Sequence, residues 1–168
     1  RLITGSTGGE VITFDRLVDS TTSALDVSVR LAGTVTEFIA NDEETVTISG
    51  STAAMDVVFT DLTLQDATSL TVSGANDITT TNNIDATILA TVDASGSTGA
   101  VDLDAGDSAV AITATGGSGG FTFEGGSGSD TITGGAGNDA LTGNGGTDTI
   151  SGGLGTDSIT GGNGADTL

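Results

Sequence analysis

The chain has 168 residues, enough for one domain or two small ones, and its 23 Asp and Glu against 3 Arg and Lys give a formal charge of -20. That charge excludes nucleic acid and anionic membrane surfaces as partners, because phosphate binding needs clustered basic side chains. Since the sequence has no Cys and no His, disulfides, thiolate metal sites and a histidine-activated nucleophile are excluded as well.

Residues 1–54 are β-rich. Val, Thr and other strand-forming residues alternate there with period two, and no stretch shows a convincing helical period. The pattern predicts strands over residues 11–14, 25–31, 34–39 and 45–48. The pattern leaves open whether this region is a small sheet of its own or part of the stack that follows. Because the sequence starts at Arg1 without an initiator Met, we interpret it as a segment of a longer protein.

Residues 55–115 have the rhythm of an irregular β-solenoid. Apolar clusters recur roughly every 9–12 residues, with Gly, Ser, Asn or Asp between them. The clusters are residues 57–59, 70–72, 78, 88–89, 101–103 and 110–112. No linker separates them from the next region, and no run of about 18 apolar residues exists, which argues against membrane insertion. We therefore predict an all-β fold, an elongated parallel β-solenoid or β-roll.

From Gly116 to Leu168 the chain repeats one nonapeptide six times. The copies are GGSGGFTFE, GGSGSDTIT, GGAGNDALT, GNGGTDTIS, GGLGTDSIT and the shorter GGNGADTL. Five copies carry an aspartate at position 6, namely Asp130, Asp139, Asp148, Asp157 and Asp166. The template G-G-x-G-x-D-x-U-x, in which U is a large apolar residue, is the signature of a calcium-binding parallel β-helix.

Two nonapeptides would close one coil with a strand on each side. We expect positions 1 to 6 to form a turn, where glycine accepts positive φ and Asn144 is the next most tolerant residue type. Positions 7 to 9 should form a very short strand. Stacked coils would place each position-6 aspartate beside the one two repeats further on. The U residues should point inward as two apolar ladders: Phe123, Ile132, Leu141, Ile150, Ile159 and Leu168.

These aspartate ladders need a neutralising cation. At about 5 Å and an effective dielectric near 20, two carboxylates repel by roughly 3 kcal/mol. Ordering the glycine-rich turns costs about 1–2 kcal/mol per residue in addition, and one apolar side chain per repeat is too little to offset both. Several Ca²⁺ ions fit best, because calcium takes 6–8 oxygen ligands, whereas Mg²⁺ demands a stricter octahedron and zinc prefers His or Cys.

The repeats resemble the RTX (repeats-in-toxin) family, whose members fold as parallel β-rolls on calcium. The resemblance covers residues 116–168 and implies ions between the turns of adjacent coils, held by position-6 carboxylates and by carbonyls of positions 1 to 5. The implied sites join turns 116–121 and 134–139, 125–130 and 143–148, 134–139 and 152–157, and 143–148 and 161–166. The implied ligands, besides the five aspartates, are Gly125, Ser127, Gly128, Ser129, Gly134, Gly135, Ala136, Gly137, Asn138, Gly143, Asn144, Gly145, Gly146, Thr147, Gly152, Gly153, Leu154, Gly155, Thr156, Gly161, Gly162 and Gly164.

The first of these sites departs from the family pattern, because Phe121 stands where an aspartate belongs. That site should be weak, or else Phe121 and Phe123 cover the end of the regular roll.

Other motifs favour less specific interpretations. Asp102, Asp104 and Asp107 could bind an additional ion, although a solvated turn is the favoured interpretation. Residues 41–44 indicate first an exposed loop, with a metal role as the alternative. Ser118 lies in a G-x-S-x-G pattern, but without a His to activate it the match carries no chemistry. We expect no enzyme activity.

The whole chain is most similar to part of the C-terminal region of Caulobacter-type bacterial surface-layer (S-layer) proteins. The similarity over residues 1–115 lies in a composition rich in Thr, Ser, Ala, Gly and Asp and almost free of basic residues. It implies a secreted cell-surface protein that self-associates in a lattice, with anchoring to surface polysaccharide through other parts of the parent chain. The alternative is the secretion and folding module of a type I-secreted protease, lipase, toxin or adhesin.

Overall fold

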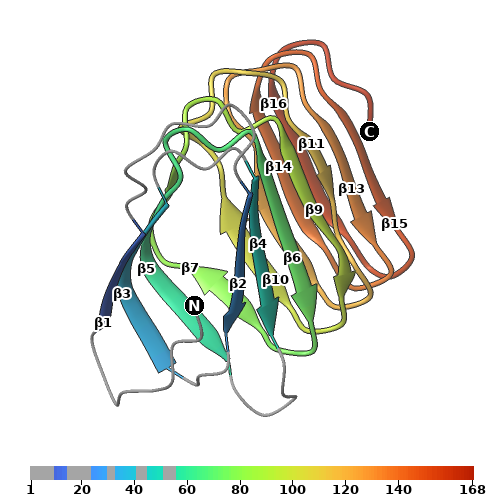
Figure 1. Cartoon of the computed structure of the whole chain (residues 1–168). Helices are drawn as coiled ribbons and strands as arrows, with labels where there is room; N and C mark the ends of the chain where they lie inside the picture. Colours follow the sequence, from blue (N-terminus) through green and yellow to red (C-terminus); the bar gives the residue numbers. More distant parts are fainter. Residues whose placement is uncertain (1–9, 15–23, 30–32, 41–44, 51–55) are drawn as a thin grey trace.

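The computed structural model describes residues 10–14, 24–29, 33–40, 45–50 and 56–168. These residues form two parallel sheets and no helix, so the described part contains no helical membrane span (Figure 1). The first sheet contains β1 (Glu10–Phe14), β3 (Gly33–Ala40), β5 (Val57–Thr63), β7 (Ile78–Thr80), β10 (Val101–Asp104), β12 (Phe121–Glu124), β14 (Ala140–Gly145) and β16 (Ser158–Asn163), with β8 (Ile84–Asp85) pairing with β5. The second contains β2 (Ala24–Val29), β4 (Thr45–Gly50), β6 (Ser69–Gly74), β9 (Thr91–Ser97), β11 (Thr113–Thr115), β13 (Thr131–Gly135) and β15 (Thr149–Gly153).

The chain winds between the two sheets, so that each coil contributes a strand to each sheet and lies on the coil before it (Figure 1). The predicted all-β parallel solenoid is therefore confirmed. The four strands predicted within residues 11–48 are also present, as β1 to β4, and they pair into the same two sheets as the rest of the chain.

The coils shorten along the chain. Upstream, one coil runs from Gly33 of β3 to its partner Val57 of β5, whereas a later one runs only from Thr122 of β12 to its partner Ala140 of β14. The later step is two nonapeptides long, and every coil after it keeps that length to the end of the described chain. The glycine turns thus replace longer corners without interrupting either sheet.

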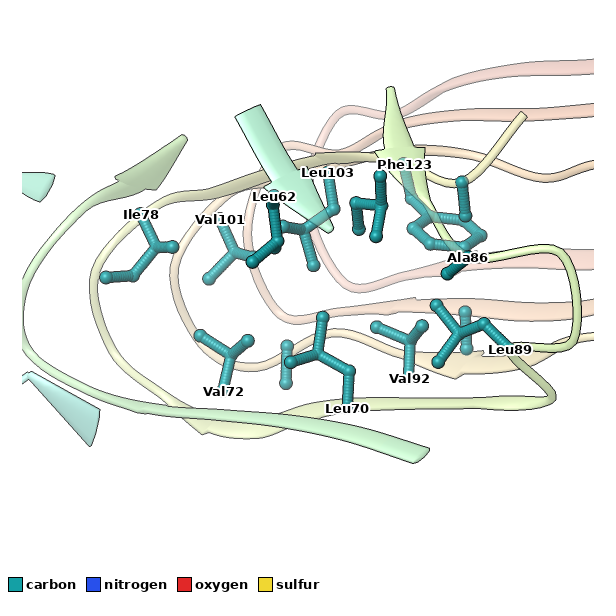
Figure 2. Packing of buried hydrophobic residues seen from close by; sticks show 14 of the residues in the cluster. Leu62, Leu70, Val72, Ile78, Ala86, Leu89, Val92, Val101, Leu103 and Phe123 are labelled. Carbon is teal, nitrogen blue, oxygen red and sulfur yellow. The ribbon is translucent and has the colours of Figure 1, made fainter. Parts of the chain in front are cut away.

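The core lies between the sheets, where alternate residues of the strands from β5 to β15 are buried. Figure 2 shows Val101 and Leu103 of β10 facing Leu70 of β6 and Val92 of β9 across it. Phe121 and Phe123 of β12 are also buried, and their rings stack with centroids 5.3 Å apart. One contiguous apolar core therefore runs from the N-terminal coils into the first nonapeptides.

The nonapeptide strands are longer than the sequence analysis predicted. β13 continues through positions 1 and 2 of the next repeat, because Gly135 still pairs with Gly153 across the ladder. Glycine can extend the strand there because its φ of 118° lies in the region that L side chains avoid. The turn is correspondingly shorter than the six positions expected.

The prediction that the U residues point into the core is confirmed for five of the six and wrong for the last. Phe123, Ile132, Leu141 and Ile150 are 2% exposed or less, and Ile159 is partly exposed but packs against the core. Leu168 is 67% exposed, because no described strand packs over it.

Candidate calcium site

The position-6 aspartates lie at the corners that precede the nonapeptide strands, and each carboxylate reaches back to the preceding coil. Its Oδ1 accepts a hydrogen bond from a backbone N–H two repeats earlier, which fixes the register of the coils. The donors to Asp130, Asp139, Asp148, Asp157 and Asp166 are, in order, Ile112 (2.8 Å), Phe121 (2.8 Å), Asp130 (2.8 Å), Asp139 (3.1 Å) and Asp148 (3.0 Å).

The second carboxylate oxygen is left without a hydrogen bond in the buried part of the ladder. Asp130, Asp139 and Asp148 are 1%, 3% and 1% exposed, and the Oδ2 of each has no hydrogen-bond partner among the described residues. An unsatisfied buried polar group costs about 1–3 kcal/mol, and more when it is charged. Three such oxygens on one short roll are therefore candidate ligands for a bound cation.

Each of these oxygens lies over the glycine at position 1 of its own repeat. A Cβ built on Gly143 would collide with Oδ2 of Asp148 and lie 2.6 Å from the carbonyl oxygen of Gly161 on the next coil. The same geometry recurs at Gly134, where the two oxygens belong to Asp139 and Gly152. A carboxylate and a carbonyl from adjacent coils thus face one small space that only glycine leaves open.

These oxygen pairs come from the turns that the sequence analysis joined. Backbone hydrogen bonds hold the turns together: Ala136 N–H donates to Gly117 O at 3.0 Å, and Leu154 N–H donates to Gly135 O at 2.9 Å. No group of three carboxylates converges among the described residues, so calcium here would need carbonyl ligands besides the aspartates. Oxygen donors of these two kinds are the ligands that Ca²⁺ prefers, and the arrangement fits it.

Some of the implied carbonyl ligands already accept a hydrogen bond. Gly125 O accepts from Nδ2 of Asn144 at 2.7 Å, and Gly135 O accepts from Leu154. A carbonyl oxygen has two lone pairs, so one remains for a metal at each position. Asn144 itself has a φ of 70°, as expected for the residue that replaces a turn glycine.

Phe121 fills the space that a carboxylate occupies in the later coils. A Cβ on Gly116 would lie 2.7 Å from Phe121 Cβ and Cδ1, just as a Cβ on Gly134 would meet the carboxylate of Asp139. The ring is buried and stacked on Phe123. The implied site between turns 116–121 and 134–139 therefore has an apolar side chain on one wall, and the carboxylates of that ladder start one coil later, at Asp139.

The other acidic candidates lie on β10 and in the turn that follows it, and two of them accept hydrogen bonds. Oδ1 of Asp104 accepts from the Gly106 N–H at 2.9 Å, and Oδ1 of Asp107 accepts from Asn83 Nδ2 at 3.4 Å. Burial raises the pKa of Asp102, and the charge of Asp104 raises it further. Residues 41–44, the other candidate, lie outside the described residues.

Sequence reasoning missed the donors at the start of the ladder. Ile112 and Phe121 have apolar side chains and lie upstream of the first aspartates, yet their N–H groups bind Asp130 and Asp139. The spacing of two repeats could have identified them, since each lies one coil before its aspartate.

The pKa values of two ladder aspartates give a test that needs no metal. Burial raises the pKa of Asp130, and the charge of Asp148 adds to the effect, against the amides of Ile112 and Gly126. Burial likewise raises the pKa of Asp139, with a contribution from Asp157 and against the amide of Phe121. A raised pKa in the folded state means that the charged form destabilises the fold, and the penalty is relieved as the pH falls through that pKa.

We therefore expect the calcium-free roll to gain β-structure as the pH is lowered from neutrality toward the raised pKa values of Asp130 and Asp139. Calcium affinity should change in the opposite direction and fall as the pH is lowered, because protons compete with the ion for the same carboxylates. Circular dichroism in chelator and calcium titrations across this range measure both. If acidification removed β-structure from the calcium-free protein, the buried carboxylates would not be what opposes folding.

This geometry defines the C-terminal third of the chain as a β-roll whose turns present carboxylate and carbonyl oxygens, the ligands that calcium prefers. Residues 115–150 and 142–168 match the family model of the RTX calcium-binding nonapeptide repeat (4 copies). Repeats of this family bind calcium, and proteins that carry them are typically secreted. Neither the curated proteins nor the solved structures gave a match to this chain.

Proposed function

We propose that this chain is a calcium-binding structural segment of a secreted bacterial surface-layer protein, in which calcium drives both folding and lattice assembly, and that it is not an enzyme. The observation that carries the folding role is the set of buried Oδ2 atoms of Asp130, Asp139 and Asp148, which have no hydrogen-bond partner among the described residues and face glycine carbonyls. A divalent ion between coils would satisfy these oxygens and cancel the repulsion along the ladder.

The composition supports the lattice role. With a formal charge of -20 and 3 basic residues, two copies repel each other unless cations lie between them. Calcium would therefore act twice, inside the coils to fold each subunit and at acidic surfaces to allow lateral packing. Residues 41–44 and 102–107 are candidates for the second role. The interior ions have more protein ligands and are held more tightly.

The second candidate is the secretion and folding module of a type I-secreted protease, lipase, toxin or adhesin. The match of residues 115–150 and 142–168 to the RTX repeat favours it as much as it favours the first. In both cases residues 116–168 would stay unfolded in a calcium-poor cytoplasm and fold outside the cell. The candidates differ in whether the folded subunits assemble.

Stepwise withdrawal of calcium from the intact parent protein separates the two. In the lattice protein we expect light scattering to fall at a higher calcium concentration than circular dichroism does, because the surface ions leave first. Magnesium at the same ionic strength is the control for general screening. A parent that never assembles, or an assembly that persists until the fold itself melts, would favour the secretion module.

A further inference from the structure

The outer face of the second sheet is a two-row array of hydroxyl side chains. Its strands pair residue by residue, so that the outward positions of successive coils fall in line. The first row contains Thr45, Ser69, Thr91, Thr113, Thr131 and Thr149. The second row, two positions further along each strand, contains Thr47, Thr71, Asp93, Thr115, Thr133 and Ser151.

Both rows are regular and accessible to solvent: Thr91, Thr113, Thr131, Thr149 and Ser151 are exposed, and the other members are partly exposed. None of their members is buried, whereas the residue between the two positions of each strand is 2% exposed or less, as at Leu70, Val92 and Ile132. The one irregularity in the pairing of these strands falls after Thr71, outside the rows. The array is therefore continuous from β4 to β15, with rungs about 4.8 Å apart and rows about 7 Å apart.

The array is also nearly free of charge, which is unusual in this chain. Asp93 is the one carboxylate in the two rows from β4 to β15, and the second row continues on β2 with Asp26, although the sequence has 23 acidic residues. The outward positions of the first sheet carry Asp102, Asp104 and Glu124 among hydroxyl residues such as Thr122 and Thr142. A face kept neutral on so acidic a protein suits an uncharged ligand.

The regularity selects among uncharged ligands. Thr is stiff at χ1, so each Thr of the array presents a hydroxyl and a methyl group in a fixed arrangement. A soluble sugar would contact a few rungs and would need an aromatic platform, but Phe38, Phe59, Phe121 and Phe123 are all buried. Similar rungs repeated on every coil suit a ligand that is itself periodic.

A second copy of the same face fits less well. Six rungs and two rows cover on the order of 300 Å², whereas a stable protein interface buries about 800 Å² on each partner. Water in ice is uncharged and periodic, it hydrogen-bonds to hydroxyl groups, and its oxygen repeats on the prism faces are close to both spacings of the array. We propose that the outer face of the second sheet binds ice.

Position 7 of four consecutive nonapeptides provides matched variants. Thr131 and Thr149 lie in the array, Thr122 and Ala140 take the equivalent place on the opposite sheet, and all four are exposed. In millimolar calcium we expect the unmodified full chain to enter slowly growing ice severalfold more than a non-binding control protein. Thr131→Lys and Thr149→Lys should lower this to the control level, whereas Thr122→Lys and Ala140→Lys should leave it unchanged.

Circular dichroism and thermal melting in calcium verify that the four variants fold alike. If one array variant fails to fold, the other still tests the proposal. Exclusion of the unmodified chain from ice, or an equal effect of all four variants, would overturn the proposal. So would a change in the light-scattering mass on Thr131→Lys without a change in ice uptake, which would identify the face as a contact between copies.

Discussion

In a calcium chelator at neutral pH, residues 116–168 are expected to lose their β-structure while residues 56–115 keep theirs. The apolar core explains the difference. Upstream coils bury several large side chains each, such as Phe59, Leu62 and Leu64, whereas the regular nonapeptides bury one each. Burial of one Ile or Leu contributes about 1.5–3 kcal/mol. That is less than the entropy cost of ordering a single nonapeptide at about 1–2 kcal/mol per residue, before the ladder repulsion is added.

Hydrogen exchange read out by segment is the measurement, with circular dichroism for the total. Millimolar Ca²⁺ should restore protection of residues 116–168, since extracellular modules bind calcium in that range, and Mg²⁺ should not. Circular dichroism that stays unchanged across a calcium titration would rule out calcium-coupled folding. Loss of protection over the whole chain would show that the upstream core depends on the roll.

The second large effect is expected for Asp148→Ala. Asp148 has a ladder neighbour on both sides, since its carboxylate binds the N–H of Asp130 and its own N–H binds Asp166. It is 1% exposed, whereas Asp166 is partly exposed and has no described coil after it. Removal of the buried acceptor should cost about 1–3 kcal/mol, and the lost ligand should lower calcium affinity roughly tenfold or more.

Asp166→Ala is the matched comparison and should cost less of both calcium and stability. Asp148→Asn keeps an oxygen for the Asp130 N–H but removes the charge, so it should recover stability in chelator more than it recovers calcium binding. Calorimetric titration and thermal melting give both quantities. Equal losses for the two alanine variants would show that the stacking of coils at two repeats per coil gives Asp148 no greater role than Asp166.

The sequence was most informative where it is periodic. The nonapeptide predicted the two-repeat coil, the neighbours of each aspartate and the departure at Phe121, because a strict repeat leaves a single register. Upstream, coil lengths vary, and Leu89 and Ile112 show why the strands there could not be placed from the sequence. Both are buried, yet both lie at corners just before β9 and β11, so burial there did not indicate a strand.

The role of the carboxylates was only half predictable. Spacing placed them together and implied metal ligation, but one oxygen of each is already used to hold the preceding coil. Which oxygen binds the N–H and which stays free depends on the orientation of the side chain over the glycine of its own repeat, as for Asp139 over Gly134. Residue identity and spacing do not contain this information, since it comes from three-dimensional packing of the turn.

The shortening of the coils also determines how the molecule responds to tension. A nonapeptide coil raises the stack by about 4.8 Å, but its two repeats extend to about 60 Å when pulled straight. If calcium holds the coils together as proposed, its loss between two coils would release a length of chain many times the height of the coil. The C-terminal third would then be an extensible tether with a calcium-dependent stiffness, attached to an upstream segment that resists stretching through its apolar core.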